Sequence, residues 1–120
     1  MKNERILLVE DDSDSLELTN QVIKILGHKD GHWVIASAST INEVRVLMEG
    51  GLTPTVAIID DHLPNPGDGG IAANIIRKHS PATIIVSYSG TREIIWSDRN
   101  WPRADMNPQK LIDALTNLKH

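Results

Sequence analysis

The stretch ILLVEDD at residues 6–12 decides the fold that the sequence predicts, because an apolar run leads directly into three acidic residues. A second run, VAIIDD at residues 56–61, ends in the same way, and a third, IIVSYSG at residues 84–90, ends in a hydroxyl residue and a glycine. Short runs rich in Ile and Val are typical of strands buried on both faces of a parallel sheet. Because ligands of such sheets bind at the carboxyl ends of the strands, we expect these polar residues to form one pocket, suited to a divalent cation and an anionic group.

The composition fits one compact domain over residues 1–120. Phe and Cys are absent, so the core must consist mainly of Ile, Leu, Val and Ala, and disulfides and thiolate metal sites are excluded. The formal net charge is −4 and the basic residues are dispersed, which argues against direct binding to nucleic acid. Since no apolar run is long enough for a signal peptide or a membrane span, we expect a soluble cytoplasmic protein without a membrane partner.

Helix signals lie between the apolar runs. Thr40 and Glu43 match a capping box, and Asn107 followed by Pro108 is typical of the start of a helix. The predicted strands are 6–9, 32–36, 55–59 and one that begins near 83, and the predicted helices are 13–26, 40–49, 71–79 and 108–118. This alternation indicates right-handed βαβ units in a three-layer α/β sandwich.

The segment from Thr91 to Met106 gives the weakest prediction. Residues 98–100 and Pro102 interrupt any apolar pattern there. The segment therefore has room for only a short fourth helix and a poor fifth strand.

Taken together, residues 6–12, DDHLP at 60–64 and IVSYSG at 85–90 resemble the receiver domain of two-component response regulators. The glycines of GDG at 67–69 also fit, and the resemblance extends from the first strand to the last helix. It implies a flavodoxin-like sheet of five parallel strands in the order 2-1-3-4-5, with a shortened fourth helix. It also implies that Asp60 accepts a phosphoryl group from a histidine kinase or a phosphotransfer protein.

The resemblance implies a Mg²⁺ cofactor as well. A carboxylate attacks phosphate poorly unless charge is neutralised, and a cation that bridges carboxylate and phosphoryl oxygens achieves this. Mg²⁺ prefers six oxygen ligands, of which only one or two are carboxylates. Asp11 matches a direct ligand and Glu10 one that acts through water. The full set implied by the resemblance is Glu10, Asp11, Asp60 and the backbone carbonyl of His62.

Each acidic run also has an ordinary structural explanation. Asp12 or Ser13 can cap the following helix, whose N-terminus favours negative charge. Asp60 and Asp61 are also common residues in turns. Because both runs follow neighbouring predicted strands, and Pro64 is in register, we favour the metal and phosphoryl interpretation.

The remaining pocket residues are assigned by the resemblance. Ser89 matches the hydroxyl that bonds the phosphoryl group, with Ser87 as a competitor on the same strand face. The backbone near Asp61 and Gly90 is expected to bind phosphoryl oxygens. The family's Lys after the fifth strand is missing, and Arg103 is the nearest basic candidate, although Arg is no conservative replacement and the residue also suits an exposed loop.

Four further side chains have candidate roles. His62 and Thr91 match positions that tune hydrolysis of the acyl phosphate, but His62 also suits an ordinary exposed loop. Trp101 is a candidate for the family's aromatic switch residue, although most Trp residues are core or rim anchors. Trp96 is a candidate to pack over the short fourth helix.

We therefore expect a stand-alone receiver that switches a contact with a downstream protein. It is not an enzyme in the ordinary sense, although it catalyses its own phosphorylation and dephosphorylation. A phosphorylation-independent pseudo-receiver is the main alternative, because the Lys is missing and the fourth helix is short. A metal-dependent phosphatase with Asp60 as nucleophile is disfavoured, since no clear general acid lies two residues later.

Overall fold

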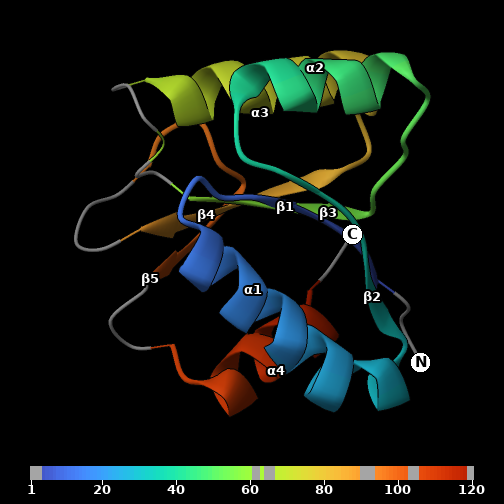
Figure 1. Ribbon diagram of the computed structural model, residues 1–120, viewed down its shortest axis with the longest axis vertical. Coiled ribbons are helices and arrows are strands. Elements are labelled where there is room, and N and C mark those ends of the chain that lie inside the picture. Colours follow the sequence, from blue (N-terminus) through green and yellow to red (C-terminus); the bar gives the residue numbers. More distant parts are fainter. Residues whose placement is uncertain (1–3, 61–62, 64–66, 90–93, 103–105, 119–120) are drawn as a thin grey trace.

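Five parallel strands form the centre of the molecule (Figure 1). The computed structural model describes residues 4–60, 63, 67–89, 94–102 and 106–118, except for the side chain of Ser89. The strands are β1 (Glu4–Val9), β2 (His32–Ala38), β3 (Val56–Asp60), β4 (Ile84–Ser89) and β5 (Arg99–Pro102). Their order is β2-β1-β3-β4-β5, which confirms the predicted topology.

Helices cover both faces of this sheet, with α2 and α3 on one face and α1 and α4 on the other (Figure 1). The helices are α1 (Ser13–Val22), α2 (Ile41–Glu49), α3 (Asp68–His79) and α4 (Pro108–Thr116). The first predicted helix does not continue to residue 26, because a π-helical turn η1 (Ile23–Gly27) and a 3₁₀ turn η2 (His28–Asp30) follow α1. No helix in the described ranges is long and apolar enough to cross a membrane.

Side-chain caps begin three of the helices. Asp12 accepts a hydrogen bond from the backbone N–H of Ser15, and Asn107 caps α4 by accepting one from Lys110. Thr40 accepts one from the N–H of Glu43 at 3.1 Å, as the capping box predicts. These caps satisfy N–H groups that have no partner inside a helix, and so they fix where each helix begins.

Two apolar clusters hold the layers together. Alternate residues of β1 point to opposite faces, so Ile6 and Leu8 pack on the side of α1 and α4, while Leu7 and Val9 pack on the side of α2 and α3. Strand β2 has one extra residue opposite β1, because Ile6 pairs with Val34 and Leu7 with Ala36. This bulge lies in an edge strand of the sheet.

The described part of the connection between β4 and β5 contains no helix. Residues 95 and 96 form a turn and residue 98 a bend, and residues 90–93 lie outside the described ranges. The fifth strand, for which the sequence pattern is poor, pairs with β4 over four residues despite Pro102. Proline is tolerated there because β5 is an edge strand and Pro102 is its last residue.

Candidate functional site

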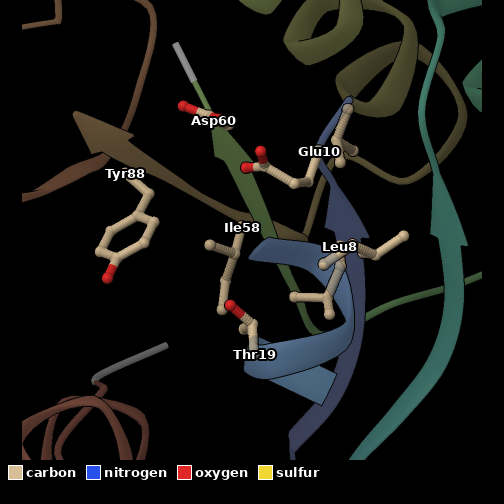
Figure 2. A pocket seen from close by; sticks show the side chains of 8 residues that line it. Leu8, Glu10, Thr19, Ile58, Asp60 and Tyr88 are labelled. Carbon is tan, nitrogen blue, oxygen red and sulfur yellow. The ribbon is translucent and has the colours of Figure 1, made fainter. Parts of the chain in front are cut away.

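Three carboxylates meet where β1 and β3 end. Glu10, Asp11 and Asp60 each place one carboxylate oxygen within 4.8 Å of the others. Strands β1 and β3 are neighbours with Val9 beside Ile59, so the residues that follow them emerge side by side. Figure 2 shows the Glu10 and Asp60 side chains close together at these strand ends. Asp60 is 2% exposed and Glu10 is 8% exposed, whereas Asp11 is open to solvent.

In the acidic run at residues 10–12, Glu10 lies in the carboxylate cluster and Asp12 caps α1. The backbone N–H of Glu10 donates to the carbonyl of Ala38 at 2.9 Å, which fixes the end of β1 against β2. The Glu10 carboxylate accepts a hydrogen bond from the N–H of Asp12 at 3.2 Å. Asp12 in turn accepts from the Ser15 hydroxyl at 2.6 Å as the cap of α1. The cap interpretation therefore holds for Asp12, whereas the metal interpretation of Glu10 and Asp11 stays a prediction.

The arrangement suits a divalent cation. Opposite ligands of an octahedral Mg²⁺ lie about 4.2 Å apart. Oxygen separations of up to 4.8 Å therefore fit one ion that is bound partly directly and partly through water. Three carboxylates this close repel one another, and a cation between them relieves that repulsion.

A small crevice lies beneath the carboxylates, between α1 and the sheet. Its volume is about 20 Å³, which is room for roughly one water molecule. Thr19 and Tyr88 line this crevice with hydroxyl-bearing side chains, and Ile58 lines it with an apolar one (Figure 2). The sequence motifs did not indicate Thr19 or Tyr88. The register between β3 and β4 places Tyr88 next to Asp60, and this register is visible only in the folded chain.

The two serines of β4 have different surroundings. Ser87 is fully buried, and its hydroxyl lies 2.8 Å from Asn100 Oδ1 and 2.9 Å from Ser97 Oγ. It therefore ties β4 to the chain that enters β5. Ser89 is the last residue of β4, at the end of the sheet where the carboxylates lie. The Ser87 hydroxyl is thus engaged with Ser97 and Asn100, and the role of Ser89 stays a prediction.

The connection before β5 is held by specific contacts. The N–H of Asp98 donates to the carbonyl of Ile85, and the Asp98 carboxylate accepts from the N–H of Ile85, both at 2.8 Å. Arg77 of α3 also pairs with Asp98 at 3.2 Å. Trp96 packs on the first turn of α3, so closely that a Cβ added to Gly69 would lie 2.5 Å from its ring. Sequence reasoning missed the role of Asp98, since nothing in its local pattern identifies Ile85 as its partner.

Several predicted site residues lie outside the described ranges. They are Asp61, His62, Gly90, Thr91, Arg103 and the side chain of Ser89. Trp101 is described, and it packs in the core on the side of α1 and α4, which supports its interpretation as a core anchor. Trp96 packs on α3.

The sequence and the structure were compared with those of known proteins. No family model matches the sequence, and no curated protein matches it. Solved structures do match. A two-component response regulator of the LuxR family from Aurantimonas has a TM-score of 0.76 at 23% identity, over 95% of this chain and 83% of that one.

Two other structures match over nearly their whole length. The signal receiver domain of the response regulator NarL from Mycobacterium tuberculosis has a TM-score of 0.75 at 18% identity, over 96% of this chain and 94% of that one. A response regulator receiver protein from Sinorhizobium medicae has a TM-score of 0.74 at 21% identity, over 96% and 93%. The strand order is the one that the resemblance implies. The resemblance that the sequence motifs indicate is thereby confirmed, and the chain has the fold of a response-regulator receiver domain.

Proposed function

We propose that the chain is a phosphorylatable receiver that stores a phosphoryl group on Asp60 in the presence of Mg²⁺. The observation that carries this proposal is the meeting of Glu10, Asp11 and Asp60 within 4.8 Å at the ends of β1 and β3. Their burial differs, since Asp60 and Glu10 are enclosed and Asp11 is exposed. That gradient suits a nucleophile held in a fixed position and a metal ligand that an ion reaches from solvent.

Asp60 performs the chemical step. One of its carboxylate oxygens attacks the phosphorus of a phosphohistidine on a histidine kinase or phosphotransfer protein. The bond from phosphorus to the donor's imidazole nitrogen breaks, and that nitrogen keeps the electron pair. Glu10 and Asp11 would hold Mg²⁺, which would supply charge neutralisation for the transferred group. Hydrolysis later returns Asp60 and inorganic phosphate.

Glu10 and Asp11 hold the ion for this step. Asp11 serves as a direct ligand and Glu10 acts through water. Glu10 is oriented by its hydrogen bond from the N–H of Asp12 and by the backbone bond to Ala38. Its carboxylate therefore does not need to be ordered when the ion binds, which reduces the entropic cost of binding.

The remaining roles follow the resemblance. Ser89 bonds a phosphoryl oxygen, as do the backbone groups near Asp61 and Gly90, and Arg103 takes the place of the missing Lys. The carbonyl of His62 completes the metal ligands. These bonds favour one arrangement of the surrounding chain, which a downstream protein then recognises. Residues 1–120 act as a single receiver domain.

One observation favours a second candidate, a pseudo-receiver with a fixed binding surface. The connection between β4 and β5 is tied to β4 by Asp98 and to α3 by Trp96. Such contacts resist a change of shape in the described part of this connection. A phosphorylation-independent interaction module would benefit from that rigidity.

Beryllofluoride with Mg²⁺ distinguishes these functions, because it mimics a phosphoryl group on a carboxylate. We expect saturable binding by the wild-type chain and no binding by Asp60→Asn. Asp14→Asn is the matched control, since Asp14 is an exposed acid in the first turn of α1 and its loss changes the net charge equally.

Acetyl phosphate gives the covalent test. The intact mass of the wild-type chain should rise by one phosphoryl group, and that of Asp60→Asn should not. A folded wild-type chain that binds neither reagent would contradict the proposal and support the pseudo-receiver. Sustained turnover of phosphomonoesters would instead identify a phosphatase.

A further inference from the structure

A histidine is enclosed at the end of the sheet opposite the carboxylates. His32 is the first residue of β2 and is 0% exposed. Gly27 of η1 leaves it just enough space, because a Cβ at Gly27 would lie 3.3 Å from the Cβ of His32 and 3.3 Å from Cδ1 of Ile112. The imidazole therefore lies between β2, the turn η1 and α4. Nothing in the proposed phosphoryl chemistry uses it.

The hydrogen bonds around His32 favour one tautomer. The Thr116 hydroxyl donates its single hydrogen to the carbonyl of Ile112 at 2.9 Å, within α4. The same oxygen lies 3.1 Å from Nε2 of His32. With the hydroxyl hydrogen directed at Ile112, this oxygen accepts from Nε2, which then carries the ring hydrogen. In the neutral ring Nδ1 is then a bare acceptor. Among the described residues this buried atom has no hydrogen-bond partner.

Two acidic groups act on the ring from different elements. Glu4 of β1 is the backbone neighbour of His32 and is itself buried, and its carboxylate accepts from the Thr55 hydroxyl at 2.8 Å. Asp30 of η2 is the second acid. Burial lowers the pKa of His32 below its usual value, and this effect exceeds the opposite effect of Glu4 and Asp30. The neutral ring is the form that the enclosure accepts.

We propose that His32 is a pH-sensitive latch that holds α4 on the sheet. Protonation places a hydrogen and a positive charge on Nδ1, where no described group accepts the hydrogen. Opening the contact between His32 and the last turn of α4 lets water solvate that charge. The latch is therefore closed in neutral solution and is released by acid.

The direction of the pH effect follows from linkage. In the opened state the histidine has an ordinary pKa of about 6.5. In the closed state the pKa is lower, so the opened state binds more protons over the interval between the two values. The closed state keeps its full stability above about pH 6.5, and the opening equilibrium rises by up to about tenfold for each pH unit between that value and the lower pKa of the closed state.

Release of α4 would also change the packing of β5, at the other edge of the sheet from β2. Leu111, Ile112 and Leu115 of α4 belong to the same apolar cluster as Trp101 of β5. Opening α4 therefore removes packing from β5. The latch would couple acidity to the edge of the molecule that lies farthest from β2 in the strand order.

Hydrogen exchange of backbone amides tests the latch. In the wild-type chain, the protection factors of α4 should fall up to about tenfold between about pH 6.5 and about pH 5.5, after correction for intrinsic rates, while those of α2 change little. In His32→Gln that fall should disappear, because the amide can still donate to Thr116 but does not titrate. His79→Gln, an exposed histidine of α3, is the control and should keep the fall.

Imidazole nitrogen shifts give a second readout that does not depend on a variant folding. They should show Nε2–H in neutral solution and proton uptake at Nδ1 that parallels the loss of α4 protection. Thr116→Val keeps the ring, and it should lower α4 protection without removing the pH dependence. An Nδ1–H tautomer would overturn the latch. So would α4 protection that is constant or rises in acid, since a rise would mean that protonated His32 pairs with Glu4.

Discussion

The two halves of the sheet are built differently. In the half formed by β1 and β3, every residue of the runs 6–9 and 56–59 is buried, and the carboxylates follow directly from where these strands end. In the half formed by β4 and β5, the last strand is short, and its approach depends on polar contacts of Ser87 and Asp98. Burial on both faces dominates in β1 and β3, whereas β5, with three of its four residues exposed, depends on individual hydrogen bonds. Single substitutions should therefore change the free energy of unfolding by different amounts in the two halves.

The largest effect is expected where Trp96 anchors the second half on α3. Gly69→Ala places a Cβ 2.5 Å from the Trp96 ring, so the connection must shift, and we expect a loss of about 1–3 kcal/mol in the free energy of unfolding. Gly70→Ala is the matched control, since its Cβ would lie 3.2 Å from Trp96 and the gain in helix propensity offsets the crowding. Urea denaturation measures both.

A double variant sharpens this test. Trp96→Leu should remove most of the penalty of Gly69→Ala, because the ring that the new methyl group meets is gone. Equal penalties with and without Trp96 would show that the ring does not anchor this half.

A smaller effect is expected from Ser87→Ala. The substitution removes the hydroxyl contacts to Ser97 and Asn100 in a buried site, and we expect a loss of roughly 1–2 kcal/mol. Beryllofluoride binding with Mg²⁺ should survive, since the carboxylates belong to the other half. Ser37→Ala, on the exposed side of β2, should be nearly neutral. Loss of ligand binding in a folded Ser87→Ala chain would contradict the division between the halves.

The smallest effect on stability is expected in the carboxylate pocket. Without metal, Asp11→Asn removes one of three mutually repelling charges and should raise the free energy of unfolding by roughly 0.5 kcal/mol. The same variant should lose the stabilisation that Mg²⁺ gives the wild-type chain. Thermal unfolding with and without Mg²⁺ measures both changes, and Asp14→Asn should show neither. Unchanged stabilisation by Mg²⁺ would remove Asp11 from the metal ligands.

The same contrast explains what could be predicted from sequence. The apolar runs at 6–9 and 56–59 predict buried parallel strands, and strand ends that emerge side by side bring Glu10 and Asp60 together. Ser87, Asp98 and His32 could not be assigned in this way. Their partners lie 10 to 84 residues away in the chain, so only the folded topology brings them together.

The bulge in β2 has a consequence for self-association. An edge strand offers unpaired backbone groups to another molecule, and β2 also exposes Trp33 and Ile35. The extra residue opposite Ile6 and Leu7 interrupts the regular spacing that a second strand would need for intermolecular pairing. On the opposite edge, β5 ends at Pro102, which has no N–H to offer. Both margins of the sheet thus discourage the strand-to-strand stacking that leads to fibrils.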